Sequence, residues 1–421
     1  MIAASRSLLL LLPLAVLLVC GLCLQAPLTY ASPSPPSPAS PPSPPSPASP
    51  TVGKDAAGNL HINTTFDTTG ATVYVNGVDL LDELATLRRE VRALRDTFGC
   101  RVFTYDVTTF ASLSGGDKWW GAVHARNDKI FGVPYDATSV LIIDPAANTI
   151  DTTSISGLAS TEGKWSDGAE APNGKVYCVP QYAGAVLIID TETYAVDVGT
   201  LGGLSGKWQD AVLANNGKIY GIPSSAASVL VIDPTSNTTD TTSLPVLSGN
   251  NKWGGGVLAA NGKIYAVPLG ESSVLIVDPE ANTVDITTIS GLPRTTSPKW
   301  WNAVLASNGN IYGIPYSSSA VLIVNPVTDA ADWTTLAGLP TTTGKWFDGV
   351  EVSDGRIVAT PDNADSILAI DTNANTTSTA TSVSSSQFKW LGAAKSAATG
   401  LVYGVPYDST SVLIINPDCV V

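Results

Sequence analysis

A Lys-Trp pair recurs through most of this chain at a nearly constant interval. The pairs are Lys118-Trp119, Lys164-Trp165, Lys207-Trp208, Lys252-Trp253, Lys299-Trp300, Lys345-Trp346 and Lys389-Trp390, with successive gaps of 46, 43, 45, 47, 46 and 44 residues. Repeats of this period are typical of propeller blades, in which each unit buries its apolar face against the next. The spacing therefore predicts seven similar units that pack together.

Each unit carries the same succession of strand and turn signals. In the unit 206–244, an apolar stretch at 211–214 is followed by the hairpin signal Asn216-Gly217 and a second apolar stretch at 218–223. A third apolar stretch at 228–233 leads through an Asp-Pro turn to a Thr-rich segment, which suits a half-exposed outer strand. Four strands per unit, with no helix between them, predict an all-β fold: a seven-bladed β-propeller over residues 100–421.

The last unit, which begins at Lys389, ends before its fourth strand. The segment 103–119, FTYDVTTFASLSGGDKW, aligns with NTVDITTISGLPRTTSPKW at 282–300, so we expect an N-terminal strand to complete the seventh blade and close the ring. Cys100 precedes that strand and Cys419 follows the strand expected beside it, which predicts a Cys100–Cys419 disulfide across the closure. Cys178 replaces a small residue of the other units and is expected to be a buried free thiol.

The segments before the propeller have distinct compositions. Residues 1–31 contain an early Arg6 and an apolar stretch, which is typical of a cleaved secretory signal peptide; a retained signal anchor is the alternative. We expect no membrane span after cleavage. Residues 32–52 are rich in Pro and Ser and predict an extended polyproline linker. Residues 53–79 contain a short β-like segment with the turn signal Asn76-Gly77.

Residues 80–98 carry a heptad pattern. Its apolar core positions are Leu80, Leu84, Leu87, Val91, Leu94 and Phe98. Acidic g positions precede basic e positions by five residues, as Glu83 precedes Arg88, which is the pairing that parallel coiled coils use between chains. The pattern favours a homo-oligomer formed through a short coiled-coil helix. A single amphipathic helix packed on its own domain is the alternative.

Two stretches resemble known families. The Pro/Ser-rich block resembles the Ser-Pro-rich segments of green-algal extracellular-matrix glycoproteins. The repeat, for example IYGIPYSSSAVLIVNP at 311–326, resembles a variant of the YVTN-type β-propeller repeat of surface-layer and other extracellular proteins. It departs from that repeat at the strand that gives the family its name, and it has Lys-Trp in place of a Pro-x-Gly entry. The resemblance implies the fold and an extracellular setting but no particular reaction.

The composition narrows the choice of partners. The chain of 421 residues has a net charge of -14, which argues against nucleic acid because phosphate binding needs a basic face. It has two histidines, His61 and His124, which argues against a His-rich metal site or a Ser-His-Asp triad. The sequons at Asn63, Asn237 and Asn375 suit a secreted glycoprotein.

Positions that break the symmetry of the ring are the best binding candidates. We define the top face as the one that carries the start of each first strand and the loop after each second strand. The Trp of each Lys-Trp pair is expected to pack between blades, and its Lys to cap backbone carbonyls or, alternatively, to ring an anion site. At the residue after that Trp and the residue after the second-strand Pro, aromatic side chains fall only in blades five, six, seven and one: Trp120, Tyr135, Trp301, Tyr316, Phe347 and Tyr407.

These blades are contiguous once the ring closes, so the pattern predicts an aromatic crescent on one half of the top face. Aromatic rings stack on the apolar faces of sugars or anchor a protein partner; filling gaps under loops is the alternative. We therefore expect a secreted, non-enzymatic binding or adhesion protein of the cell wall or extracellular matrix. Its partner would be an extracellular polysaccharide or a matrix protein, bound without a cofactor. A purely structural wall glycoprotein is an alternative.

A second alternative rests on the channel. Two residues after the Trp lie the oxygen-bearing side chains Asp167, Asp210, Asn302 and Asp348. Such ligands suit a Ca²⁺ ion, although ordinary hydrogen bonding at a wet channel wall explains them equally. Propeller lactonases hold a channel metal with similar ligand types, and this resemblance implies a metal-dependent hydrolase as the competing function.

Overall fold

The computed structural model describes residues 51–54, 60–63, 74–75, 78–79, 103–246 and 248–417. The chain divides into two units, residues 1–81 and 82–421, which are described separately. In the first unit, β1 (Thr51–Lys54) pairs antiparallel with β2 (Leu60–Asn63), and β3 (Tyr74–Val75) with β4 (Val78–Asp79). The latter pair is the hairpin expected around Asn76-Gly77. The predicted signal peptide, nearly all of the linker, the coiled-coil helix 80–98, and Cys100 and Cys419 lie outside the described residues.

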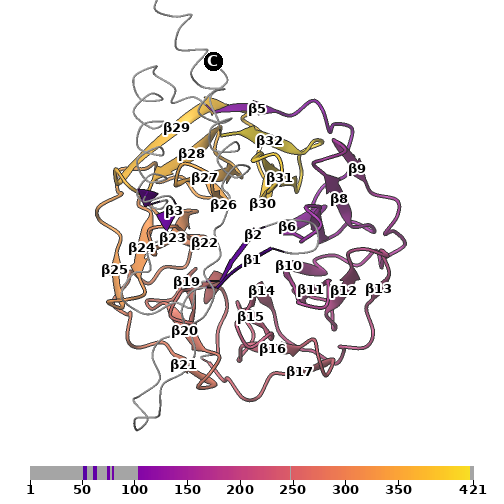
Figure 1. The fold of residues 1–421 in the computed structure, drawn as a ribbon, viewed down its shortest axis with the longest axis horizontal. Coiled ribbons are helices and arrows are strands. Elements are labelled where there is room, and N and C mark those ends of the chain that lie inside the picture. The colour runs from indigo at the N-terminus through magenta and orange to yellow at the C-terminus, as the bar shows by residue number, and fades with distance from the viewer. Residues whose placement is uncertain are drawn as a thin grey trace, which may run out of the picture. The chain divides into compact units, whose positions relative to one another are not determined.

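The second unit is a ring of seven antiparallel, four-stranded sheets, as the repeat predicts (Figure 1). The part of the chain that the structure describes is all-β, and none of it forms a helix long and apolar enough to cross a membrane. Each first strand begins at the Trp of a Lys-Trp pair, and each second strand ends at a Pro that occurs in all seven repeats. Each blade therefore runs from the Trp near the channel outward to a short edge strand.

The strand bounds repeat closely from blade one to blade seven. The first strands are β6 (Trp119–His124), β10 (Trp165–Glu170), β14 (Trp208–Leu213), β18 (Trp253–Leu258), β22 (Trp300–Leu305), β26 (Trp346–Glu351) and β30 (Trp390–Lys395). The second strands are β7 (Ile130–Pro134), β11 (Lys175–Pro180), β15 (Ile219–Pro223), β19 (Ile264–Pro268), β23 (Ile311–Pro315), β27 (Arg356–Pro361) and β31 (Val402–Pro406). The third strands are β8 (Leu141–Asp144), β12 (Leu187–Asp190), β16 (Leu230–Asp233), β20 (Leu275–Asp278), β24 (Leu322–Asn325), β28 (Ser366–Asp371) and β32 (Leu413–Asn416). The fourth strands are β9 (Thr149–Asp151), β13 (Val196–Asp197), β17 (Thr238–Asp240), β21 (Thr283–Asp285), β25 (Ala330–Asp332), β29 (Thr376–Ser382) and β5 (Thr104–Asp106).

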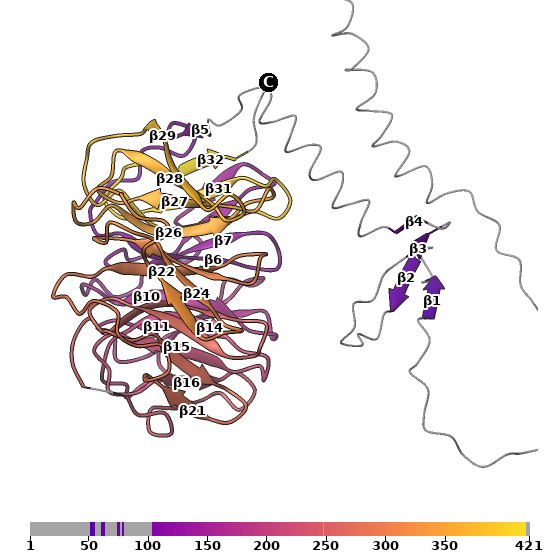
Figure 2. The same cartoon turned by 90° about the vertical axis from the view of Figure 1, so that its left-hand side faces the viewer.

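The ring closes as the sequence predicts. The seventh sheet has the order β30-β31-β32-β5, so the N-terminal strand supplies its outer edge. Thr104 lies opposite Asn416 and Asp106 opposite Ile414, and Figure 2 shows β5 beside β32 at one end of the propeller. The two ends of the propeller chain therefore meet in one blade, which holds the last unit in the ring.

The seven Trp residues fill the boundaries between blades. Seven buried apolar clusters each combine side chains of two neighbouring blades, and each contains one of these Trp residues. The indole Nε1 then donates to a backbone carbonyl on its own blade, as Trp208 does to Ser228 at 2.9 Å and Trp253 to Ser273 at 2.8 Å. This confirms the expectation that these Trp residues pack between blades, since a buried indole N–H needs an acceptor.

The Lys residues of the pairs cap loop carbonyls on the top face. Lys345 Nζ donates to the carbonyls of Tyr316, Ser318 and Thr342 at 3.1, 3.0 and 3.1 Å. Lys118, Lys164, Lys252, Lys299 and Lys389 are also buried and make similar bonds. Lys207 differs: it is only half-buried, and its Nζ lies 3.4 Å from the centre of the Tyr182 ring. The Lys residues thus fasten loops to blades, as the sequence predicts.

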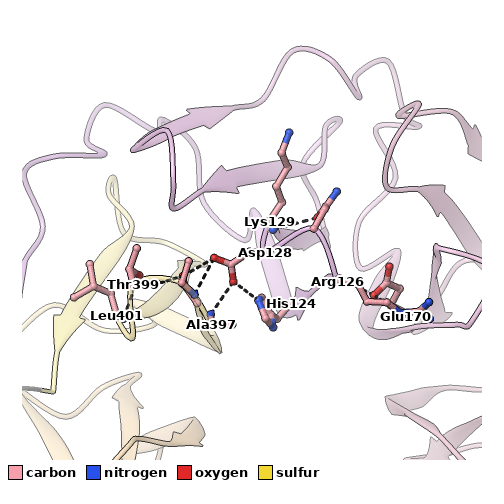
Figure 3. Close-up of polar contacts among 11 residues, drawn as sticks. His124, Arg126, Asp128, Lys129, Glu170, Ala397, Thr399 and Leu401 are labelled. Carbon is pink, nitrogen blue, oxygen red and sulfur yellow. Dashed lines mark hydrogen bonds and ion pairs between the residues drawn. The ribbon is translucent and has the colours of Figure 1, made fainter. Parts of the chain in front are cut away.

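On the opposite face, hairpin turns join several blades to the next. Asn216 donates to the Pro279 carbonyl of the following blade at 3.3 Å, and Asn261 to that of Pro326 at 3.0 Å. The boundary between blades seven and one uses a carboxylate instead (Figure 3). Asp128 accepts hydrogen bonds from the Ser396 hydroxyl and the Ala397 amide, both at 2.7 Å, and it bonds His124 at 2.6 Å. The closing boundary is therefore held by polar contacts as well as by β5.

The Thr-rich fourth strands end in a common turn. Asp240 Oδ1 accepts hydrogen bonds from both the amide and the hydroxyl of Thr242 at 2.7 Å, and Asp285 bonds Thr287 in the same way. These bonds to hydroxyls and amides hold the pKa of both carboxyls well below its usual range. The aspartates of the outer strands therefore act as turn-forming residues.

Candidate functional site

Each first strand opens with a β-bulge at its top end. In blade two, Trp165 pairs with Pro180 and the register resumes with Gly168 opposite Cys178, so Ser166 and Asp167 together face one residue of the second strand. The same shift follows the first Trp in all seven blades. Bulges re-aim side chains and are common beside functional sites. The bulge contains the residue after the Trp, which is one of the two positions that carry the aromatic residues, and the position of Asp167.

The six aromatic residues singled out in the sequence meet in one cluster. Trp120 lies at its centre, with its ring centroid 4.6 Å from Tyr135 and 5.5 Å from Phe347. Its centroid also lies 5.6 Å from that of Tyr407 and 6.0 Å from that of Trp301. Tyr316 joins through Trp301 at 4.6 Å. We call these six residues the aromatic cluster.

The aromatic cluster extends across the axis of the ring. Trp120 belongs to blade one and Trp301 to blade five, and two blades separate them in the closed ring. Contact between their rings therefore requires both side chains to reach over the central channel, which makes a compact cluster rather than the expected open crescent. Phe347 is buried, whereas the other five residues are partly exposed.

Several polar atoms around the aromatic cluster are buried without a hydrogen-bond partner. They are Trp301 Nε1, Ser317 Oγ and both carboxylate oxygens of Asp362. Asp362 follows the second-strand Pro of blade six, the position that Tyr316 and Tyr407 hold in the neighbouring blades. Only 1% of its surface is exposed, and burial raises the pKa of Asp362 to about 7 against the attraction of Lys389. The sequence shows an Asp where the neighbouring blades have Tyr, but only the structure shows that this Asp362 carboxylate has no hydrogen-bond partner.

Blades two, three and four have no aromatic side chain at the same positions, and all of these residues except Leu269 are polar or small. Gln181 and Gln209 are buried, and Gln181 Nε2 donates to Gln209 Oε1 at 3.3 Å. Gln181 Oε1 and Gln209 Nε2 have no partner. Ser166 donates to the Trp208 carbonyl at 2.7 Å, and blade four has Gly254. We call this side of the channel mouth the polar half and blades five, six, seven and one the aromatic half.

The residues suggested as metal ligands tie neighbouring inner strands together. Asp348 accepts hydrogen bonds from Asn302 Nδ2 at 2.7 Å and from the amide of Ala393 in the next blade at 2.9 Å. Asp210 similarly accepts from the Gly256 amide of blade four at 2.8 Å. The neighbouring glycines leave room for these side chains, because a Cβ on Gly255 would lie 1.5 Å from Asn302 Oδ1. These contacts account for the pattern as links along the channel wall.

The same carboxyl groups resist ionisation. Burial raises the pKa of Asp348 to about 7 and that of Asp210 to about 6. Burial also raises the pKa of Asp167 well above its usual value, with further contributions from the charges of Asp210 and Asp348. Within residues 103–246 and 248–417, no three His, Cys, Asp or Glu side chains are arranged to hold a metal ion. Channel Ca²⁺ remains a prediction from the residue types alone.

The remaining predicted positions lie away from this site. Cys178 is fully buried and free, as expected, and burial raises the pKa of its thiol. Asn237 and Asn375 are exposed in the turns between third and fourth strands, on the face opposite the aromatic cluster. Asn63 is the last residue of β2 in the first unit.

The fold and site define a seven-bladed β-propeller with an asymmetric channel mouth. A scan of protein-family models finds no match to the chain, and a search of curated proteins finds none either. Among solved structures, a streptogramin B lyase is similar, with a TM-score of 0.60 at 11% identity over 75% of this chain and 98% of the lyase. Virginiamycin B lyase from Staphylococcus aureus gives a TM-score of 0.60 at 10% identity over 75% of this chain and 100% of its own.

A third similar structure is that of YCF48 bound to D1 peptide, with a TM-score of 0.55 at 10% identity over 76% of this chain and 96% of that chain. At these identities the likeness shows the fold alone. The resemblance to the YVTN repeat is accordingly confirmed for the propeller fold, while membership of that family stays a prediction.

Proposed function

We propose that this chain is a secreted binding protein of the cell wall or extracellular matrix, whose top face binds a polysaccharide or a matrix protein. The observation that carries the proposal is the aromatic cluster, in which four blades contribute six rings to one partly exposed surface over the channel. Aromatic rings provide large, rigid contact areas, and such residues dominate the binding energy of many interfaces.

The polar atoms beside the rings support the same proposal. Trp301 Nε1 is a donor without an acceptor, and Ser317 Oγ is also unpartnered. A buried polar group without a partner costs about 1–3 kcal/mol, so a ligand that supplies the partner recovers that cost. Ligands rich in hydroxyl or amide groups, such as sugars and peptides, offer donors and acceptors beside an apolar face.

The rest of the chain fits display of this face. The exposed sequons Asn237 and Asn375 lie on the opposite face, so glycans there would leave the aromatic cluster accessible. A signal peptide over 1–31 and a stiff linker over 32–52 would place the propeller outside the cell and away from its attachment. Self-association through residues 80–98 would then present several binding faces together and raise avidity without new contacts.

The experiment is a binding assay of the full secreted chain against a glycan array and immobilised cell-wall and matrix fractions. Saturable binding to one class is expected. Trp120→Ala should abolish retention because it removes the ring at the centre of the aromatic cluster. Trp301→Phe keeps a ring but deletes the unpartnered Nε1–H, and it should weaken binding about tenfold without loss of stability.

Tyr182→Ala is the matched control. Tyr182 is 63% exposed on the same face and lies near Tyr135, but its ring is not stacked on any of the six cluster residues, so binding should change far less than in Trp120→Ala. Melting temperatures of all variants are measured alongside, and binding is compared well below the lowest of them. Equal binding by wild type and Trp120→Ala would refute a role for the aromatic cluster.

A further inference from the structure

Asp362 is the one carboxylate among the seven residues that follow the second-strand Pro. The equivalent residues are Tyr135, Gln181, Ser224, Leu269, Tyr316 and Tyr407. Asp362 is almost completely buried, and neither of its carboxylate oxygens has a hydrogen-bond partner. A buried carboxylate is costly unless it is paired, so a fold that retains one at a symmetric position needs a reason beyond packing.

The groups around Asp362 do not supply a partner. Lys389 attracts it electrostatically, but Lys389 Nζ donates to the backbone carbonyls of Asp362 and Ser386, both at 2.6 Å. The Tyr316 hydroxyl is close enough to lower the pKa of Asp362, although neither carboxylate oxygen meets the geometry of a hydrogen bond. Asp408 adds a second negative charge nearby. Asp362 therefore lies between a lysine, whose ammonium group bonds backbone carbonyls, and a second carboxylate, and neither of its own carboxylate oxygens has a hydrogen-bond donor.

The same place is lined with aromatic rings. The charge of Asp362 contributes to the raised pKa of the Tyr316 hydroxyl, and the Tyr316 ring lies 6.2 Å from Phe347 and 4.6 Å from Trp301, centroid to centroid. Ring faces carry partial negative charge and attract cations, most strongly when the site is desolvated. Deeper in the channel, Asp348 and Asp210 add buried carboxyls. Rings and carboxylates together favour positive charge over neutral or negative groups.

We propose that Asp362 and the aromatic cluster bind a protonated amine on the ligand, with the ammonium group paired to the Asp362 carboxylate and covered by the rings. Trp301 Nε1 would donate to a hydroxyl or carbonyl oxygen next to that amine. The inference rests on the proposed function and names the chemistry of its ligand. The amine belongs either to an amino sugar or to a lysine side chain, and the two sources share this one contact.

The Tyr316 side chain interacts with Asp362 and its ring contacts that of Trp301, so we expect a ligand at Asp362 to change the surroundings of Trp301. Tryptophan fluorescence of the full chain therefore reports occupancy. The probes are a β-1,4-linked glucosamine hexamer and its N-acetylated form, and a lysine-containing peptide and its acetyl-lysine form, all at about pH 6.5. Each pair differs only in whether the amine is free or masked, and the two pairs separate the two sources.

The structure offers a matched pair of variants. Asp362→Asn removes the buried charge and keeps the shape, whereas Glu162→Gln removes an exposed charge close enough to affect Tyr135. We expect the free amine of at least one pair to bind about tenfold or more tightly than its masked form. Asp362→Asn should abolish that preference, and Glu162→Gln should preserve it.

The possible outcomes distinguish a failure of the amine site from a failure of the proposed binding function. Equal binding of free and masked amines, with both lost in Trp120→Ala, overturns the amine site and leaves the binding function standing. A free-amine preference that persists in Asp362→Asn also overturns it, because surface charge then explains the effect. Absence of binding by any probe in this assay and by every fraction in the array experiment overturns both.

Discussion

The aromatic half and the polar half of the channel mouth are built from the same repeat positions, yet they satisfy their buried atoms differently. In the aromatic half, six rings contact one another and leave Asp362 and Trp301 Nε1 without partners. In the polar half, Gln181 and Gln209 bond each other, and Ser166 bonds a backbone carbonyl. One half therefore concentrates apolar surface and an unpaired charge, whereas the other pairs part of its polarity internally and leaves Gln181 Oε1 and Gln209 Nε2 without partners.

This difference teaches where repetition stops constraining the chain. The bulge after each Trp is the same in every blade, so the backbone presents equivalent positions all around the channel. The apolar packing between blades is carried by the Trp residues, and some residues beside them, such as Ser166 and Asp348, add hydrogen bonds to the next blade. The side chains in the bulges are consequently free to differ, and the two halves differ there without a change of fold.

The largest expected effect compares the anchoring of one loop above the aromatic half with that of one loop above the polar half. Lys345, in the aromatic half, donates to three carbonyls, while Lys207, in the polar half, rests on the exposed ring of Tyr182. Lys345→Met should lower the free energy of unfolding by about 2–4 kcal/mol because it leaves those carbonyls without a donor. Lys207→Met should cost less than about 1 kcal/mol. Denaturant unfolding of both variants measures the difference, and equal losses would contradict the distinction.

A smaller effect is the dependence of stability on pH, which tests the ionisation of the buried carboxyl groups. The pKa values of Asp362 and Asp348, about 7, and of Asp210, about 6, lie above the value of about 3.9 expected in the unfolded chain. The folded state therefore binds more protons between about pH 4 and 7, so stability is highest near the low end of this window and falls as pH rises through all of it. The propeller should melt at a lower temperature at about pH 7.5 than at about pH 5.

Asp362→Asn removes part of that pH dependence. At about pH 7.5 it should raise the free energy of unfolding by about 1–3 kcal/mol, because a buried, unpaired charge is replaced by a neutral isostere. At about pH 5 the variant and the wild type should be nearly equal. The turn aspartate Asp240 provides the contrast. Its pKa is lowered, so its contribution to the free energy of unfolding is fully present above about pH 4, and Asp240→Asn should destabilise the propeller at both pH values. If Asp362→Asn instead lowered the free energy of unfolding at about pH 7.5, the Asp362 carboxylate would have a stabilising partner in the folded protein.

Much of the propeller could be predicted from the sequence because its evidence is periodic. The Lys-Trp spacing fixes the number of blades, the hairpin signals fix the strand order, and the segment from Phe103 supplies the missing strand. The blades that carry aromatic residues could also be read directly, since the closed ring makes blades seven and one neighbours. These are properties of position along the chain, which repetition makes explicit.

The remaining features of the site depend on register and packing, which the repeat does not encode. The bulge becomes evident only when Trp165 is paired with Pro180 and Gly168 with Cys178. The close approach of blades four and five depends on Gly254, because a Cβ there would lie 2.0 Å from the Trp301 carbonyl oxygen. Asp362 is visible in the sequence as a change from Tyr, but its missing partners are a property of its neighbours. The sequence thus locates the asymmetry and leaves its chemistry to the structure.

The smallest expected effect is the coupling between Lys207 and Tyr182, the contact that blade three has in place of carbonyl capping. The Lys207 Nζ lies 3.4 Å from the centre of the Tyr182 ring, and that ring is 63% exposed. Exposed cation–π pairs contribute about 0.5–1 kcal/mol. A double-mutant cycle with Lys207→Met and Tyr182→Ala should therefore give a coupling free energy near 0.5 kcal/mol, measured by denaturant unfolding. A coupling above about 2 kcal/mol would mean that this loop is held as firmly as those of the aromatic half, and the contrast between the two loop anchors would fail.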